Sequence, residues 1–76
     1  MNSPYFKDVS KLKSVDIYRV LNLFDVRSHA VGHAIKKLLC AGKRGAKDYR
    51  QDLIEAKASI DRELEMMDEE EPHDVR

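Results

Sequence analysis

The sequence predicts a small all-α fold built from three helices. The chain has 76 residues, which is enough for one domain at most. Three of its segments carry apolar residues at helical spacing, and two of its three glycines and both prolines lie between or outside them. We therefore expect a three-helix domain at residues 14–67. A polar lead-in at residues 1–13 precedes it, and an acidic, proline-containing tail at residues 68–76 is expected to be disordered.

The first predicted helix covers residues 15–23. Ser14 is placed to cap its free amides, and Asp16 falls in its first turn, where a carboxylate is favourable. Its apolar residues follow the i, i+3, i+4, i+7 pattern of one helical face, which we expect in the core: Ile17, Val20, Leu21 and Phe24.

The second predicted helix covers residues 29–41. Asp25 or Ser28 precedes it as the N-cap, and Gly42 follows it as a natural left-handed stop. Its apolar positions are Val31, Ala34, Ile35, Leu38 and Leu39.

The third predicted helix covers residues 48–67. Asp48 and Gln51 have the spacing of a capping box, with Asp in place of Ser or Thr. Its continuous apolar stripe is expected to pack on both shorter helices and still offer apolar length to another subunit, so we expect a homo-oligomer. The stripe consists of Tyr49, Leu53, Ala56, Ile60, Leu64 and Met67.

The net charge of zero is unevenly distributed along the chain. Residues 1–50 hold eleven Lys and Arg against four Asp and Glu, whereas residues 51–76 hold three against ten. The basic part can attract a polyanion, or the two parts can simply attract each other between neighbouring helices or subunits. The acidic second half makes a broad nucleic-acid footprint an unlikely expectation. No apolar run reaches the length of a membrane span and no signal-peptide core precedes residue 13, so a cytoplasmic location is expected.

The most informative segment is a basic junction between the second and third helices. Gly42 and Gly45 would let backbone amides approach a phosphate, and the start of the next helix offers further free amides. The alternative is a solvated basic loop. The spacing is not that of a P-loop. The cations of this junction are Lys43, Arg44, Lys47 and Arg50.

Polar residues at helical spacing line up beside this junction. His29, His33 and Lys36 or Lys37 share one helix face and are expected to contact phosphate or a base. Partly buried helix histidines are the alternative, and no glutamate accompanies the pair as it does in zinc motifs, so no metal is expected. Asp52 and Glu55 are candidates to hold Mg²⁺ beside a phosphate, or to pair with lysines of the second helix.

No nucleophile with a neighbouring base is evident. Cys40, the single cysteine, is expected to pack as a small apolar residue. No catalytic residue is therefore assigned.

Residues 15–63 contain a series of short motifs in order: Val15-Asp16-Ile17; Gly32 with Ala34-Ile35-Lys36; Ala41-Gly42-Lys43-Arg44; Asp52-Leu53 with Ala56; and Arg62-Glu63. In this series the chain resembles a family of small helical bacteriophage proteins of unknown function, one branch of which is a nucleotide kinase without a P-loop in short-tailed coliphages. The resemblance implies a helical fold and a nucleotide-like ligand. Polar positions of the pattern are changed at His33, Lys37, Cys40 and Glu55.

These observations predict a phage-type protein that binds a nucleotide-like phosphorylated ligand without catalysis, for instance to sequester a host nucleotide or immune signal in the host cytoplasm. Two alternatives remain open. One is a nucleotide kinase or phosphohydrolase that uses Mg²⁺ as its only cofactor. The other is a protein-interaction module that inhibits a host factor.

Overall fold

The computed structural model describes residues 4–43 and 45–70 of the chain. Three helices make up its regular structure: α1 (Ile17–Leu23), α2 (His29–Leu39) and α3 (Ala46–Glu70). Within these described residues there is no β-strand. The predicted all-α class with three helices is therefore confirmed.

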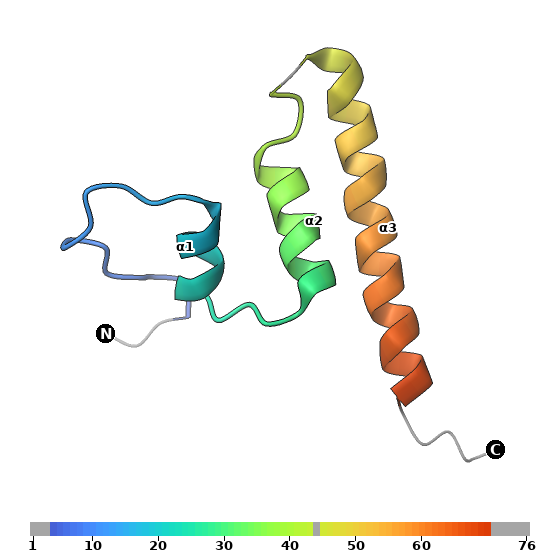
Figure 1. Cartoon of the computed structure of the whole chain (residues 1–76), viewed down its shortest axis with the longest axis horizontal. Coiled ribbons are helices and arrows are strands. Elements are labelled where there is room, and N and C mark those ends of the chain that lie inside the picture. The colour runs from blue at the N-terminus through green and yellow to red at the C-terminus, as the bar shows by residue number, and fades with distance from the viewer. Residues whose placement is uncertain (1–3, 44, 71–76) are drawn as a thin grey trace.

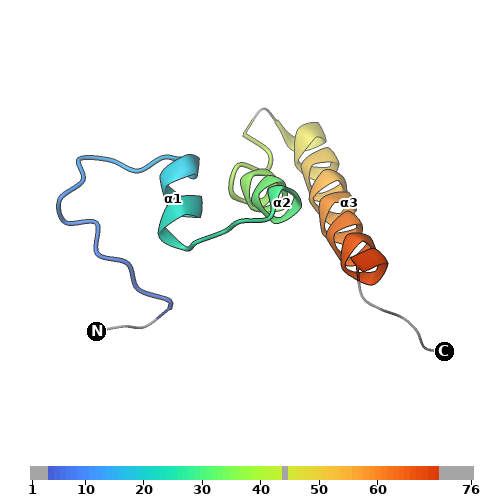
Figure 2. The ribbon, with the colours of Figure 1, turned by 60° about the horizontal axis from the view of Figure 1, so that its bottom comes forward.

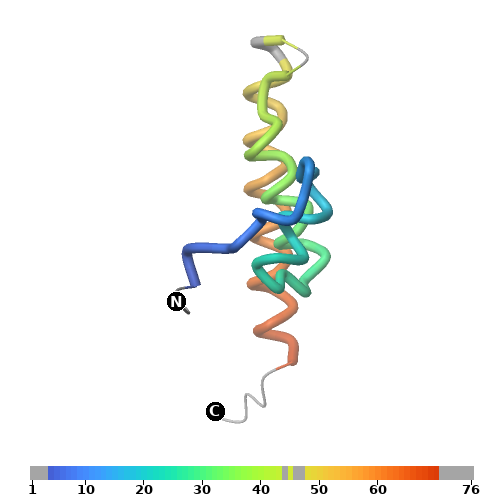
Figure 3. The backbone as a smooth tube through the Cα atoms, turned by 90° about the vertical axis from the view of Figure 1, so that its left-hand side faces the viewer, coloured from blue at the N-terminus to red at the C-terminus, as the bar shows by residue number. Residues whose placement is uncertain are grey.

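The three helices lie side by side in the order α1, α2, α3 (Figure 1), and α2 and α3 run antiparallel. The row of helices remains visible after rotation (Figure 2), and from the side the chain is narrow (Figure 3). The shortest principal extent is 16 Å, little more than one helix with its side chains. The radius of gyration is 15.9 Å, compared with about 11 Å for a compact chain of this length. The fold is therefore a single layer of helices with two open faces.

Helix α1 is capped at both ends by aspartates. Asp16, not Ser14, is the N-cap, because its carboxylate accepts the backbone N–H of Arg19 at 2.9 Å. Asp25 adopts a left-handed φ of 56° just beyond the helix, and the N–H of Val26 donates to the carbonyl of Leu21. This is the Schellman arrangement, with aspartate in the position where glycine is usual.

Helix α2 begins and ends close to its predicted limits. Ser28 is its N-cap and accepts the N–H of Val31 at 3.0 Å. The helix ends at Leu39, two residues earlier than expected, with Cys40 as the C-cap. Gly42 has the expected left-handed φ, 76°, but it lies two residues beyond the C-cap, so it shapes the turn after α2 and does not itself end the helix.

Helix α3 differs from its predicted limits at both ends. It begins at Ala46, and the carbonyl of Gly45 accepts the N–H groups of Asp48 and Tyr49. Asp48 therefore lies inside the first turn, and the predicted capping box is wrong. The helix continues to Glu70, so residues 68–70 of the expected tail are helical. Glutamate and methionine are good helix formers; residues 71–76 lie outside the described part.

An ion pair on the outer surface of α3 supports its last turns. One guanidinium nitrogen of Arg62 lies 3.1 Å from carboxylate oxygens of both Glu65 and Glu69. Hydrogen bonds that Arg62 donates to Glu69 and then to Glu65 raise the pKa of Arg62. Because all three side chains are half exposed or more, this contact adds only modestly to helix stability.

The buried part of the layer is very small. Its members are Gly32 and Ala34 of α2 and Asp52 and Ala56 of α3. The apolar stripe expected to pack on both shorter helices is exposed apart from Ala56, and no residue of α1 is fully buried. The apolar face of α1 was expected in the core, and the α3 stripe was expected to pack on both shorter helices. Both predictions are wrong. The stripe does not pack on α2, because the side of α3 that contacts α2 is polar.

The lead-in runs beside α1 and is largely exposed. Tyr5 and Phe6 are 82% and 75% exposed. Lys7 lies over the ring of Phe24, with its Nζ 5.2 Å from the ring centroid, within range of a cation–π contact. The lead-in therefore contributes little burial to the layer.

Candidate functional site

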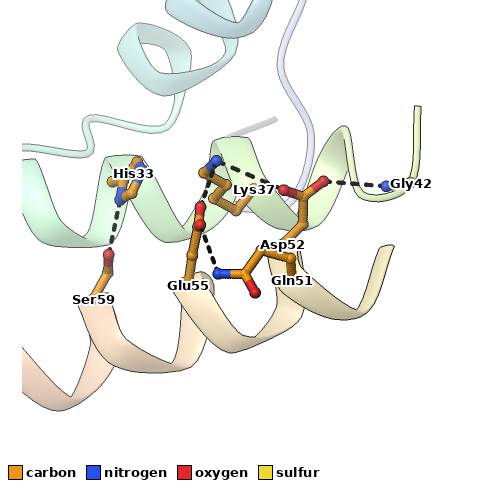
Figure 4. A network of polar contacts seen from close by, with 7 residues as sticks. All are labelled: His33, Lys37, Gly42, Gln51, Asp52, Glu55 and Ser59. Carbon is orange, nitrogen blue, oxygen red and sulfur yellow. Dashed lines mark hydrogen bonds and ion pairs between the residues drawn. The ribbon is translucent and has the colours of Figure 1, made fainter. Parts of the chain in front are cut away.

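A seam of polar contacts joins α2 to α3 (Figure 4), and the part nearest the turn after α2 centres on Asp52. The Asp52 side chain is 6% exposed. Its carboxylate accepts the backbone N–H of Gly42 at 3.2 Å and lies 3.6 Å from Nζ of Lys37. A buried carboxylate is stable only when charge and hydrogen bonds compensate its lost hydration. Asp52 therefore connects the turn after α2 to the body of α3.

Lys37 is shared between two carboxylates of α3. Its Nζ also lies 2.7 Å from Glu55, which in turn accepts a hydrogen bond from Gln51 at 2.9 Å. The hydrogen bond from Lys37 and then that from Gln51 hold the pKa of Glu55 below its usual value. Asp52 and Glu55 were candidates either to hold Mg²⁺ or to pair with lysines of the second helix. In the structure both lie beside Lys37 of α2.

The part of the seam nearer the start of α2 is also polar. The Nδ1 atom of His33 lies 2.8 Å from the hydroxyl of Ser59, and the hydroxyl of Ser28 donates to Glu63 at 2.7 Å. These contacts and those of Asp52 pair successive turns of two antiparallel helices. They fix which turn of α2 faces which turn of α3.

A hollow of about 330 Å³ lies between α1 and α2. Its floor is apolar, formed by Ile17, Leu21, Val26 and the backbone of Gly32. Its polar lining consists of Tyr18, Arg27, Ser28, His29, His33 and Lys36. None of these lining residues is a carboxylate, so the hollow favours an anion.

Three of the predicted ligand-binding residues meet in this hollow. His29, His33 and Lys36 are all exposed on the same flank of α2, which contradicts the alternative of partly buried histidines. Arg27, which precedes α2, was not predicted. It pairs with Asp25 at 3.1 Å, but both side chains are more than 70% exposed and remain accessible.

A second hollow of about 250 Å³ lies at the end of α2, lined by Lys36, Lys37, Cys40, Lys43 and Asp52. Lys36 borders both hollows and lies at their boundary. Cys40 is exposed there as a free thiol, so its predicted packing as an apolar residue is wrong. Lys37 faces Asp52 and Glu55, which leaves Lys36 and Lys43 as the cations best placed for an external anion.

Three backbone amides of the basic junction that were expected to be free for a phosphate already have partners within the chain. The N–H of Gly42 is bound by Asp52, that of Lys43 by the carbonyl of Cys40, and that of Gly45 by the carbonyl of Gly42. Arg50 is exposed on the first turns of α3. Arg44 lies outside the described residues, and so does the side chain of Lys47.

Sequence reasoning missed Tyr18 and Arg27. Neither lies on the helical face that carries the histidines, and only the packing of α1 against α2 brings them there. The one available signal for Arg27 was its position directly before the capping residue Ser28. Across the described ranges 4–43 and 45–70, no three His, Cys, Asp or Glu side chains converge as a metal site would require.

The fold and this hollow define a small all-α protein with an open, basic site. No family model, no curated protein and no solved structure matches the chain. Among the helices of the described residues, none combines the length and the apolar character that crossing a membrane demands.

Proposed function

We propose that this protein binds a small, nucleotide-like phosphorylated ligand in the hollow between α1 and α2, without catalysing its conversion. The observation that carries the proposal is the lining of the hollow, in which two cations and two histidines stand over an apolar floor with no carboxylate among them. A ligand with one anionic end and one flat, partly apolar end is complementary to such a surface.

Each part of the ligand has a chemically suitable partner. Lys36 supplies a mobile point charge at the boundary of the two hollows, and Arg27 supplies a planar fork that matches phosphate. Tyr18 and the imidazole of His29 offer flat surfaces for a base. A second phosphate would extend toward Lys43 at the end of α2.

Simple binding is favoured over chemistry by the arrangement of the carboxylates. Asp52 and Glu55, the pair suited to hold Mg²⁺ beside a phosphate, face Lys37 within the seam. A bound Mg²⁺ would have to displace that lysine. The resemblance to the phage family is the basis for proposing a host nucleotide or immune signal as the ligand, sequestered in the host cytoplasm.

The test is calorimetric titration with a panel of mono-, di- and cyclic nucleotides. A charge-assisted hydrogen bond contributes about 1.5–3 kcal/mol, so Lys36→Ala should weaken binding about tenfold or more. Lys57→Ala is the matched control, because Lys57 is an exposed lysine of α3 that pairs only with Asp61 in the same helix, outside either hollow. The Lys57→Ala variant should bind nucleotide with the affinity of the unaltered protein.

Two outcomes would oppose the proposal. Absence of binding across the whole panel would remove the nucleotide interpretation and favour a role in protein interaction. Equal affinities for Lys36→Ala and the unaltered chain would show that a ligand binds elsewhere.

A further inference from the structure

One open face of the helical layer is apolar. On α3, the polar contacts to α2 come from Asp52, Glu55, Ser59 and Glu63. Successive residues advance about 100° around a helix, so the exposed stripe of α3 lies about a quarter turn from this contact side. The stripe consists of Tyr49, Leu53, Ile60, Leu64 and Met67, which are 37–54% exposed.

The middle helix continues the same apolar face. On α2, His33 and Lys37 approach α3 from one flank, and Val31, Ile35 and Leu38 occupy the opposite flank. Because α2 and α3 run antiparallel, that opposite flank lies on the same side of the layer as the α3 stripe. The layer thus has a polar face, which carries both histidines, and an apolar face formed by α2 and α3.

The area left uncovered is large for a chain of this size. The accessible surface is 6549 Å², whereas a compact folded monomer of this mass exposes about 4,800 Å². The exposed lead-in and the two open faces of the layer share this excess, which is more than the roughly 800 Å² that each partner buries in an interface of standard size. A helical layer is stable when a second layer covers its apolar side.

The charge pattern of α3 identifies the partner that fits. Residues 43–50, at its start, hold four Lys and Arg and one Asp, whereas residues 61–70, at its end, hold six Asp and Glu and one Arg. Two copies of α3 packed antiparallel place each basic end beside the acidic end of the other. Their helix dipoles are then also opposed. A parallel pair would place like charges together at both ends.

We propose that the apolar face of α2 and α3 is covered by a second copy of this chain, in a two-fold dimer whose α3 helices pack antiparallel about the middle of their apolar stripes. Such an interface is isologous, because the same patch serves both subunits. The hollow between α1 and α2 opens on the other face and stays accessible. The dimer does not depend on the identity of any ligand.

Sedimentation velocity of the full chain tests the association. The expected species at micromolar concentration has twice the 8.8 kDa mass of one chain. Ile60→Lys, which introduces a charge at the centre of the stripe, should raise the dimer dissociation constant tenfold or more. Ala58→Lys is the matched control, since Ala58 is an exposed residue of the same helix on the polar flank; it should leave the mass unchanged.

Disulfide trapping tests the antiparallel arrangement without relying on a disruptive substitution. In a Cys40→Ser background, Ile60→Cys should link to itself, because it lies near the two-fold axis. Leu53→Cys alone should not link, because its two copies lie about 15 Å apart along the helices, beyond the reach of a disulfide. Leu53→Cys mixed with Leu64→Cys should link, because these positions oppose each other.

The outcomes separate the alternatives. A helical 8.8 kDa monomer at all concentrations overturns the proposal and leaves the apolar face to a different protein. Self-linking of Leu53→Cys overturns the antiparallel arrangement. Loss of the dimer in Ala58→Lys as well as in Ile60→Lys overturns the assignment of the face. Nucleotide binding that fails while the dimer persists would refute the proposed function alone.

Discussion

Removing the carboxylate of Asp52 should destabilise the helical hairpin formed by α2 and α3. Asp52→Ala deletes the acceptor of the Gly42 N–H and one of the two carboxylates beside Lys37. Loss of a hydrogen bond to a charged group costs about 1.5–3 kcal/mol. Lys37 keeps Glu55 at 2.7 Å and is not left as an isolated charge, so the larger cost of breaking a buried pair does not apply. Alanine is also a better helix former by about 0.5 kcal/mol.

The expected net loss in the free energy of unfolding is therefore about 2 kcal/mol, which for a domain of this size lowers Tm by about 10 °C. Urea unfolding followed by circular dichroism measures it, with every variant at one protein concentration because association adds to apparent stability. Asp61→Ala is the control. It breaks an exposed ion pair with Lys57, whose N–O distance of 3.1 Å is similar to those of Asp52. This change should cost at most about 0.5 kcal/mol. If Asp52→Ala falls within the range of this control, the seam does not hold the helices together.

Two further predictions concern the same hairpin. Gly42→Ala should cost about 1–3 kcal/mol in urea unfolding, because φ is 76° and the new Cβ would lie 2.9 Å from a ring atom of Tyr49. Truncating the ring with Tyr49→Ala should reduce that cost, and an equal cost in both backgrounds would show that the contact with Tyr49 is irrelevant. The hairpin should also lose stability in acid: Lys37 holds the pKa of Glu55 below its ordinary 4.5, so the contribution of Glu55 is fully present above pH 4.5 and is lost as the pH falls through the lowered value. Glu55→Gln should flatten this part of the pH profile of unfolding, and identical acid profiles would contradict the assignment.

The helices were predictable because their signals are local. A 3.6-residue apolar period, a capping serine and a left-handed glycine act over a few residues. Ser28 caps α2 as its position indicated, and Gly42 adopts the expected left-handed φ in the turn that follows. The start of α3 was not predicted. Asp48 is a residue type typical of an N-cap, but it is the carbonyl of Gly45 that accepts the first N–H groups of the helix. Aspartate is favourable in both places, and its position alone does not distinguish them.

The packing of α3 was not predictable from its apolar stripe. A stripe of large apolar residues usually marks the side of a helix that faces its neighbour. Here the neighbour contacts a second, polar series that includes Asp52, Ser59 and Glu63, at equally good helical spacing. Choosing between two faces of one helix requires knowing what lies opposite. The candidate site was likewise predictable only in part. Helical spacing grouped His29, His33 and Lys36 correctly, but Tyr18 joins them only because α1 packs beside α2.

A polar seam between two helices has a consequence for how this chain reaches a stable state. The seam buries little apolar surface, since the small side chains of Ala34 and Ala56 are its only buried hydrophobic residues among those described. Its directional contacts instead specify one register, which sliding apolar side chains would not. Register and burial are thus provided by different sides of α3, and the burial is missing from a single chain. We infer that the hairpin acquires most of its stability when a second copy covers the apolar face. In the proposed dimer, folding and association are one process, and the proposed ligand-binding hollow lies outside the interface.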